Sequence, residues 1–283
     1  MLNQVELHEK ILYPVVRVRT GKAGGSGTVI YSRASTKDPS TYQSFVLTCA
    51  HVITNAIKIK MEWDGLLKKE IRKEFMEQVQ VEVFDYVYLS QVNSSNSYRA
   101  DIIAYDKTVD LAVLKVDTPK PLPFTATLIP KEKLDSLKVF DASYTSGCSL
   151  GHDPIVNQGQ ITYLTERIDN KVYLMSNSAS IFGNSGGALF SADTGEQIGV
   201  TARITSLQLG FGVDIITWMG FCVSPQEIYK FLDEQEIQFL YNPADTFEEC
   251  MLRRERKQKS ALKQPTTMVD EELNDEEPFA EAL

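Results

Sequence analysis

The chain has 283 residues, of which 43% are hydrophobic and 24% are charged, and its formal net charge is −9. This composition is typical of an ordinary globular protein and excludes a fibrous or wholly disordered chain. Residues 270–281 contain many acidic residues and no basic residue. Because this end would repel nucleic acid, we expect no nucleic-acid partner.

The N-terminus and the cysteines suggest a compartment. The first ten residues, MLNQVELHEK, lack the basic start and the apolar run of a secretory signal, and the chain has no run of 18 apolar residues. We therefore expect a cytoplasmic protein without a membrane partner. The four cysteines stand far apart at positions 49, 148, 222 and 250, which predicts free thiols.

The first half of the chain has the pattern of an all-β protein. Residues 1–12 predict a short helix or an irregular arm. Over residues 13–118, short segments rich in β-branched and aromatic residues alternate with Gly, Ser, Pro and Asp clusters, and residues 90–97 predict a polar turn. Residues 64–79 differ, because their apolar positions are spaced near 3.6 and predict an inserted amphipathic helix.

The second half repeats this pattern. A Pro-rich stretch, TPKPLPF, predicts a linker, and residues 119–242 contain a second series of short strands. Residues 225–240 end this part with a helical period and a Pro near the first turn. Residues 243–283 form a charged tail that could begin as a helix and is expected to be partly disordered.

The strongest chemical motif is Gly183-Asn184-Ser185-Gly186-Gly187, directly before an apolar segment. A serine hydroxyl becomes a nucleophile when a base takes its proton and fixed donors stabilise the oxyanion. Glycines around Ser185 allow the N–H groups of Gly183 and Ser185 to converge on one point. A glycine-rich turn without catalytic function explains the motif equally well when it is taken alone.

Two further residues complete a possible triad. His51 follows the apolar segment SFVLT, and Asp110 precedes the apolar segment LAVLKV. An acid there would accept the Nδ1 proton of the histidine and stabilise the imidazolium. Asp106 is the rival acid, but it lies in turn-like sequence, so we favour Asp110.

The strings GSGTVI, TCAHV, DLAVLKV, QGQIT, SIFGNSGGALF and GFCVSPQEI follow one another in this order. In this respect the chain resembles the trypsin-like serine proteases of the HtrA/Deg branch over roughly residues 13–240. The resemblance implies an all-β, chymotrypsin-like fold of two six-stranded antiparallel β-barrels, one over residues 13–118 and one over 119–242. It also implies a serine endopeptidase with the catalytic triad His51, Asp110 and Ser185 and no cofactor. A PDZ domain, usual in this branch, does not fit beyond residue 243.

The resemblance also implies how substrate binds. Ala179, six residues before the nucleophile, would lie at the base of the primary pocket, so small or medium apolar side chains are expected before the scissile bond. The segment Val200, Thr201 and Ala202 would pair with the substrate backbone. Secreted zymogens of the family carry Asp where this chain has Asn184, so N-terminal processing is not the expected activation.

Several alternatives stay open. A protease fold without catalysis could capture peptides or serve as a scaffold, and an unrelated β-rich domain would make the motifs coincidental. No metal site is expected, because Cys49 with His51 and Cys148 with His152 each offer two ligands. Besides a protein or peptide substrate, a regulatory partner could bind the inserted helix or the tail, although both could equally be passive decorations. An oligomer is possible, but no residue establishes one.

Overall fold

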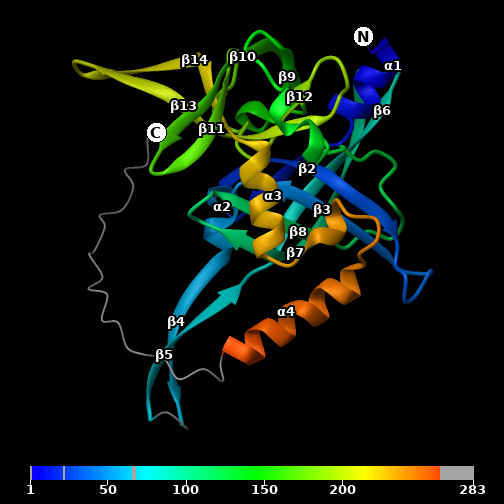
Figure 1. Ribbon diagram of the computed structural model, residues 1–283, viewed down its shortest axis with the longest axis vertical. Helices are drawn as coiled ribbons and strands as arrows, with labels where there is room; N and C mark the ends of the chain where they lie inside the picture. Colours follow the sequence, from blue (N-terminus) through cyan, green and yellow to red (C-terminus); the bar gives the residue numbers. More distant parts are fainter. Residues whose placement is uncertain (1, 22, 66–67, 262–283) are drawn as a thin grey trace.

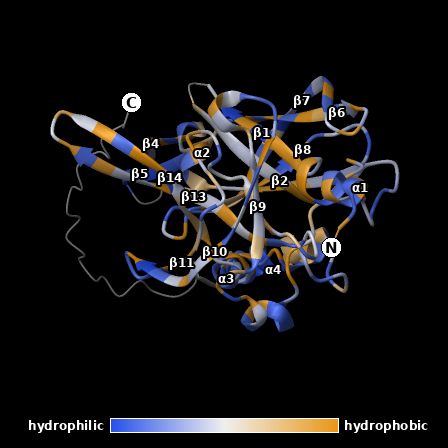
Figure 2. Cartoon of the chain, turned by 90° about the horizontal axis from the view of Figure 1, so that it is seen from above, coloured by the Kyte–Doolittle hydropathy of each residue, from blue (hydrophilic) through white to orange (hydrophobic). Residues whose placement is uncertain are grey.

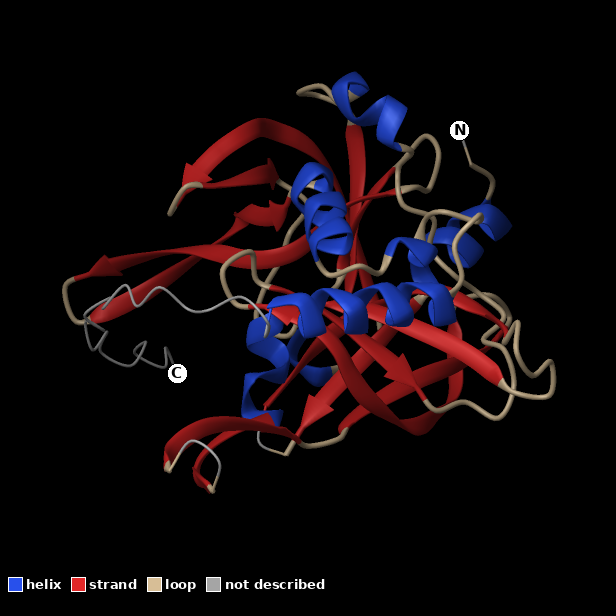
Figure 3. Cartoon of the chain, turned by 60° about the horizontal axis from the view of Figure 1, so that its bottom comes forward, coloured by secondary structure: helices blue, strands red, loops and turns tan. Residues whose placement is uncertain are grey.

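The computed structural model describes residues 2–21, 23–65 and 68–261, and these form two β-barrels with a few short helices on the outside (Figures 1 and 3). The expected all-β double barrel is confirmed. The N-terminal arm consists of α1 (Gln4–Leu7) and a π-helical turn, η1 (His8–Leu12).

The first barrel is closed by six antiparallel strands in the order β1-β2-β3-β8-β7-β6. Its β1 pairs on both edges, with Val18 opposite Gly25 on β2 and opposite Val81 on β6. The predicted turn at residues 90–97 is wrong, because β7 already begins at Gln91 and its polar residues pair with β6. The strands are β1 (Val15–Thr20), β2 (Ala23–Ala34), β3 (Tyr42–Thr48), β6 (Val79–Val87), β7 (Gln91–Asp106) and β8 (Leu111–Val116).

The second barrel is closed by six strands in the order β10-β11-β14-β13-β12-β9. The short β12 lies between β9 and β13, with Ala188 opposite Ser146 on one side and Val200 on the other. Because β12 starts three residues after Ser185, the barrel wall fixes where the glycine-rich motif emerges. The strands are β9 (Ala142–Gly147), β10 (Ile155–Ile168), β11 (Lys171–Ser176), β12 (Ala188–Ser191), β13 (Gln197–Leu209) and β14 (Gly212–Val223).

One hydrophobic core runs from the first barrel into the second. It joins Phe45 and Leu114 of the first barrel to Tyr173 and Val200 of the second. Helix α3 (Pro225–Glu234) packs into the same core, with Phe231 and Leu232 at most 2% exposed. Burial of this apolar surface holds the two barrels together as one body.

The expected C-terminal helix is shorter than predicted. The side chain of Ser224 caps α3, Pro225 occupies its first position, and the helix ends at Glu234. A 3₁₀ turn, η5 (Gln238–Leu240), replaces the last predicted turns, and a charged helix, α4 (Phe247–Ala261), follows. The acidic end of the predicted tail, residues 262–283, lies outside the described residues.

The predicted helix at 64–79 is wrong, because residues 69–76 of this segment form one strand of a two-stranded ribbon. The ribbon pairs β4 (Ile57–Asp64) with β5 (Lys69–Met76) and projects from the body in Figure 1. The spacing of Ile71 and Phe75 led to the wrong prediction, because two residues four apart lie on one face of a helix and also on one face of a strand. Pairing with β4, whose apolar residues alternate, decides between the two.

A second ribbon projects from the other barrel, where β13 and β14 extend beyond it (Figure 1). Figure 2 colours hydrophobic residues orange on this ribbon as well as in the barrel strands. Four large apolar side chains near its end are exposed: Leu207, Leu209, Phe211 and Val213. Exposed apolar groups gathered at one place suggest a surface that contacts another molecule.

The remaining expectations concern membranes and thiols. Among the described residues, no helix is both long enough and apolar enough to cross a membrane. All four cysteines are described, and each is a buried free thiol. The prediction of free thiols is therefore confirmed.

Candidate active site

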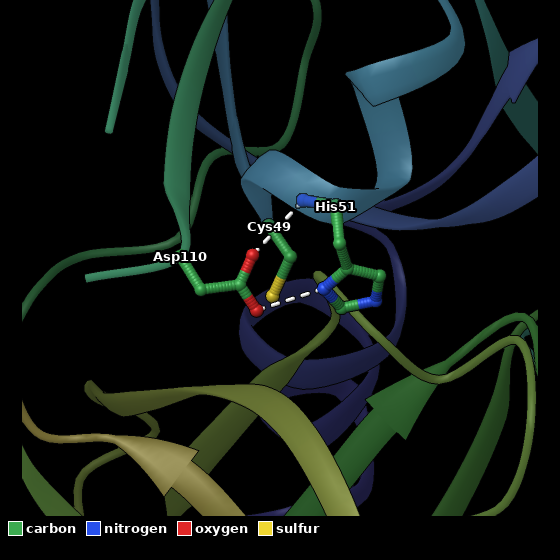
Figure 4. A group of neighbouring side chains, drawn as sticks. All are labelled: Cys49, His51 and Asp110. Atoms are coloured by element: carbon green, nitrogen blue, oxygen red, sulfur yellow. Dashed lines mark hydrogen bonds and ion pairs between the residues drawn. The ribbon is translucent and has the colours of Figure 1, made fainter. Parts of the chain in front are cut away.

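His51 and Asp110 form a close pair at the rim of the first barrel (Figure 4). His51 lies in α2 (Ala50–Ile53), directly after β3, and Asp110 immediately precedes β8. The Nδ1 atom of His51 is 2.7 Å from Oδ2 of Asp110, and the backbone N–H of His51 donates to Oδ1 at 2.9 Å. Both carboxylate oxygens thus hold the histidine, so its ring has one favoured orientation.

The Asp110 side chain is mostly buried and the His51 side chain is open to solvent, as general-base chemistry requires. The side chain of Asp110 is 13% exposed, whereas that of His51 is 49% exposed. Asp110 also has a φ of +59°, a left-handed conformation that aspartate tolerates better than most residues. A buried acid in this conformation behind an open imidazole resembles a functional arrangement more than a packing one.

The rival Asp106 has a local role. Its Oδ1 accepts the N–H groups of Thr108 at 2.6 Å and Val109 at 3.3 Å, which closes the turn before β8. The structure therefore pairs His51 with Asp110 and leaves Asp106 in the turn.

Ser185, from the second barrel, lies near the helix that carries His51. Its carbonyl accepts the N–H of Ser26 at 2.8 Å, and the next residue, Gly186, donates to the carbonyl of Thr201 at 2.8 Å. A Cβ atom on Gly25 would come within 2.6 Å of Val52 and 2.7 Å of the Ser185 carbonyl, so Gly25 separates Ser185 from α2 by a single backbone. Within the described chain, no hydrogen bond joins the Ser185 hydroxyl to His51.

The turn before Ser185 is held so that two N–H groups stay free. The carbonyl of Phe182 accepts the N–H of Leu150 at 2.8 Å, and the carbonyl of Gly183 accepts the hydroxyl of Ser26 at 2.6 Å. Among the described residues, the N–H groups of Gly183 and Ser185 donate to no protein acceptor. Both can therefore serve an oxyanion.

Gly183 cannot carry a side chain. Its φ is +91°, and a Cβ atom would lie 2.6 Å from the N atom of Leu150 and 2.7 Å from the carbonyl of Cys148. A side chain at position 183 would thus clash with the loop 148–151 and not with the oxyanion position itself. Glycine is required here for backbone conformation and for space.

Sequence reasoning missed Ser26. This fully buried residue on β2 accepts the N–H of Cys148 at 2.7 Å while its hydroxyl donates to Gly183. Its own N–H donates to Ser185, so one residue connects three segments of the site. The motif GSGTVI contained it, but the hydrogen bonds that give it a role join residues far apart in the sequence.

The predicted substrate-binding residues lie in two places, Ala179 in the segment after β11 and the other three on β13. Ala179 is half-buried, and its carbonyl accepts the Thr145 hydroxyl and the Asn157 amide. Val200 pairs with β12 and β14, and Thr201 exchanges both backbone bonds with Gly186 and Gly187. Among the described strands, none pairs with this edge of β13 beyond Thr201, so Ala202 begins its open part.

Cys49, the N-cap residue of α2, lies behind the pair. Its thiol donates to the carbonyl of Thr201 at 3.3 Å. Burial, together with the negative charge of Asp110, raises the pKa of the Cys49 thiol well above its ordinary value. The thiol is therefore protonated and is not itself a nucleophile at neutral pH.

Comparison with known proteins decides the family. Residues 25–200, which contain His51, Asp110 and Ser185, match the family described as a trypsin-like peptidase domain. The chain belongs to the trypsin-like peptidase family.

Relatives place this trypsin-like peptidase near the DegP-like proteins. It is 34% identical over 134 residues to a probable periplasmic serine endoprotease DegP-like of Halomonas elongata, covering 46% of this chain and 27% of the relative. A protein of the same name from Pseudomonas savastanoi pv. phaseolicola is 32% identical over 126 residues, covering 44% of this chain and 25% of the relative. The chain thus spans about a quarter of the length of these relatives.

Solved structures agree on the fold. The HtrA-type protease AlgW with tripeptide superposes with a TM-score of 0.58 and 20% identity, covering 84% of this chain and 64% of that chain. The predicted resemblance to the HtrA/Deg branch is confirmed.

The expected cytoplasmic location is wrong. It rested on the character of the first ten residues and on the lack of a long apolar run, whereas the two DegP-like relatives are both named periplasmic endoproteases. The names of these relatives point to the periplasm.

Proposed function

We propose that this trypsin-like peptidase is a serine endopeptidase with Ser185 as nucleophile, His51 as general base and Asp110 as the acid that orients it. The observation that carries the proposal is the doubly hydrogen-bonded His51–Asp110 pair, at 2.7 and 2.9 Å, next to a glycine turn with two free N–H groups. The DegP-like relatives, which are named serine endoproteases, support it.

In this mechanism Asp110 accepts the Nδ1 proton of His51, so the lone pair of the histidine lies on Nε2. Nε2 takes the proton from Ser185 as its oxygen attacks the scissile carbonyl. The N–H groups of Gly183 and Ser185 stabilise the oxyanion. Protonated His51 then delivers the proton to the leaving amine, which leaves an acyl-enzyme on Ser185 that water hydrolyses by the same steps.

The substrate is a protein or peptide with a small or medium apolar residue before the scissile bond. In this proposal Ala179 lies at the base of the primary pocket, and the N–H of the next residue, Ser180, donates to the carbonyl of Thr217 on β14 at 2.9 Å. None of these residues carries a charge that would select Lys or Arg. The peptide backbone pairs with β13 from Ala202 onward, because that edge is open.

A regulatory protein partner and an oligomer belong to the same proposal. The ribbon β4–β5 exposes Ile59, Met61 and Trp63 in alternation along one face, with Met76 on the paired strand. This stripe replaces the predicted helix as the partner-binding part of the insertion.

Two measurements test the function. A fluorophosphonate should label wild type at Ser185, and Ser185→Ala should abolish both labelling and cleavage in a peptide-library digest. Ser44→Ala is a matched control, since Ser44 is a buried serine of the first barrel outside the site. Cleavage that persists in Ser185→Ala would refute the proposal, and the absence of labelling and cleavage in folded wild type would favour the alternative of a catalytically silent peptide-binding scaffold.

A further inference from the structure

A third ligand joins the two that the sequence placed near each other. The ligand atoms of Cys49, His51 and Asp110 all lie within 4.8 Å of one another, as Figure 4 shows. Among the described residues, this is the one group of three or more His, Cys, Asp or Glu side chains with such closeness. Two ligands in the sequence, Cys49 and His51, did not indicate a metal site, but Asp110 completes a set typical of zinc.

We propose that these three side chains form an inhibitory binding site for a soft divalent cation of the zinc and cadmium class. Thiolate sulfur, imidazole nitrogen and carboxylate oxygen are the ligands that zinc takes in proteins. The cation binds the Sγ atom of Cys49, the Nδ1 atom of His51 and a carboxylate oxygen of Asp110. A thiolate and a carboxylate balance the two positive charges, so the complex is neutral and suits a buried position.

The movement that binding requires is small. In a tetrahedral zinc site with bonds of about 2.0 to 2.3 Å, ligand atoms are separated by about 3.3 to 3.6 Å. The Nδ1–Oδ2 distance is 2.7 Å and must open by less than about 1 Å, while the widest separation, within 4.8 Å, must close by a similar amount. The 49% exposed imidazole can rotate to admit the cation.

The thiol loses its proton when the cation binds. Burial and the charge of Asp110 disfavour a free thiolate at this position. A dication next to the sulfur reverses that balance, because a coordinated thiol is deprotonated, and its proton is released to solvent as the metal–sulfur bond forms. The displaced hydrogen bond to the carbonyl of Thr201 is the main protein contact that the thiol gives up.

Inhibition follows from the histidine tautomer and rests on the proposed function. A cation on Nδ1 leaves the ring proton on Nε2, so Nε2 has no lone pair to accept the proton of Ser185. The cation also takes the carboxylate that orients the ring. The general base is therefore blocked without any change at Ser185.

Binding is tested separately from catalysis. Cadmium titration of wild type should produce the ultraviolet charge-transfer absorption of a cadmium–thiolate bond, equivalent to about one thiolate per chain. Cys49→Ala and His51→Ala should each lose this absorption or weaken cadmium binding at least 10-fold. Cys222→Ala, which removes another buried thiol beside Thr201, should retain it.

Activity gives the second readout. Zinc should slow fluorophosphonate labelling of wild type at least 10-fold, a chelator should restore it, and Cys49→Ala should show the same labelling rate with and without zinc. No absorption in wild type, or absorption undiminished in Cys49→Ala or His51→Ala, would overturn the site. If the protein labels with no reagent but the absorption behaves as expected, the site stands and only the proposed function fails.

Discussion

The hydroxyl of Ser26 is the sharpest place to test how the oxyanion turn is held. Ser26→Ala removes two hydrogen bonds, to the Gly183 carbonyl at 2.6 Å and from the Cys148 N–H at 2.7 Å, at a position without solvent access. Each buried group left without a partner costs about 1 to 3 kcal/mol, so the variant, which leaves two, should lose roughly 2 to 6 kcal/mol of unfolding free energy.

The catalytic effect should appear in kcat. Complete removal of an oxyanion donor costs about 10²–10³ in kcat. Ser26→Ala displaces the Gly183 N–H without deleting it, so we expect kcat to fall about 10- to 100-fold. KM should change little, because the oxyanion forms only in the transition state.

The assay compares peptide hydrolysis by wild type, Ser26→Ala and Ser44→Ala, with thermal unfolding recorded for each. Ser44 is equally buried and also makes two hydrogen bonds, at 2.9 Å to Ser32 and 3.0 Å to Thr118. Its variant should lose stability but keep kcat. A Ser26→Ala protein that is folded and keeps a kcat within about twofold of wild type would show that the turn needs no such support.

Three other predictions concern the acid, the glycine turn and a surface carboxylate. Asp110→Asn should lower kcat by about 10⁴ while Asp106→Asn stays near wild type in the same peptide assay, and equal losses would reject the assignment. Gly183→Ala should abolish fluorophosphonate labelling, whereas Gly210→Ala, a left-handed position with nothing within 4 Å, should label normally, and normal labelling of both would contradict the clash described above. Burial raises the pKa of Glu248, but hydrogen bonds from the backbone and from Gln43, Thr36 and Ser35 outweigh it and lower the pKa. The ionised group therefore stabilises the fold above the unfolded pKa of about 4.3, and this stabilisation is lost as pH falls through the lower folded value. Glu248→Gln should thus weaken the protein more at pH 7 than at pH 3 in urea unfolding.

Local sequence predicted the strands well because strand residues carry their own pattern. The apolar runs of β3 and β8 are typical of strands buried on both faces, whatever they pair with. The ribbon β4–β5 shows the limit of such reasoning. A spacing of four between Ile71 and Phe75 fits two periodicities, and only the partner strand decides, which a single segment does not reveal.

The candidate site divides in the same way. His51, Asp110 and Ser185 could be predicted because each lies in a motif beside an apolar strand. The supporting role of Ser26 could not, because its partners Gly183 and Cys148 lie more than a hundred residues away. The same holds for Cys49, whose proximity to Asp110 depends on the pairing of β3 with β8.

The proposed proton path crosses the boundary between the two barrels. His51 and Asp110 belong to one barrel and Ser185 to the other, and the Ser26–Ser185 backbone bond ties them across it. The proposed hydrolysis therefore depends on the contact between the two barrels, and not only on each barrel being folded. A small separation of the barrels would abolish activity while every strand stayed paired. On heating, loss of turnover should therefore precede the loss of the β-sheet circular dichroism signal.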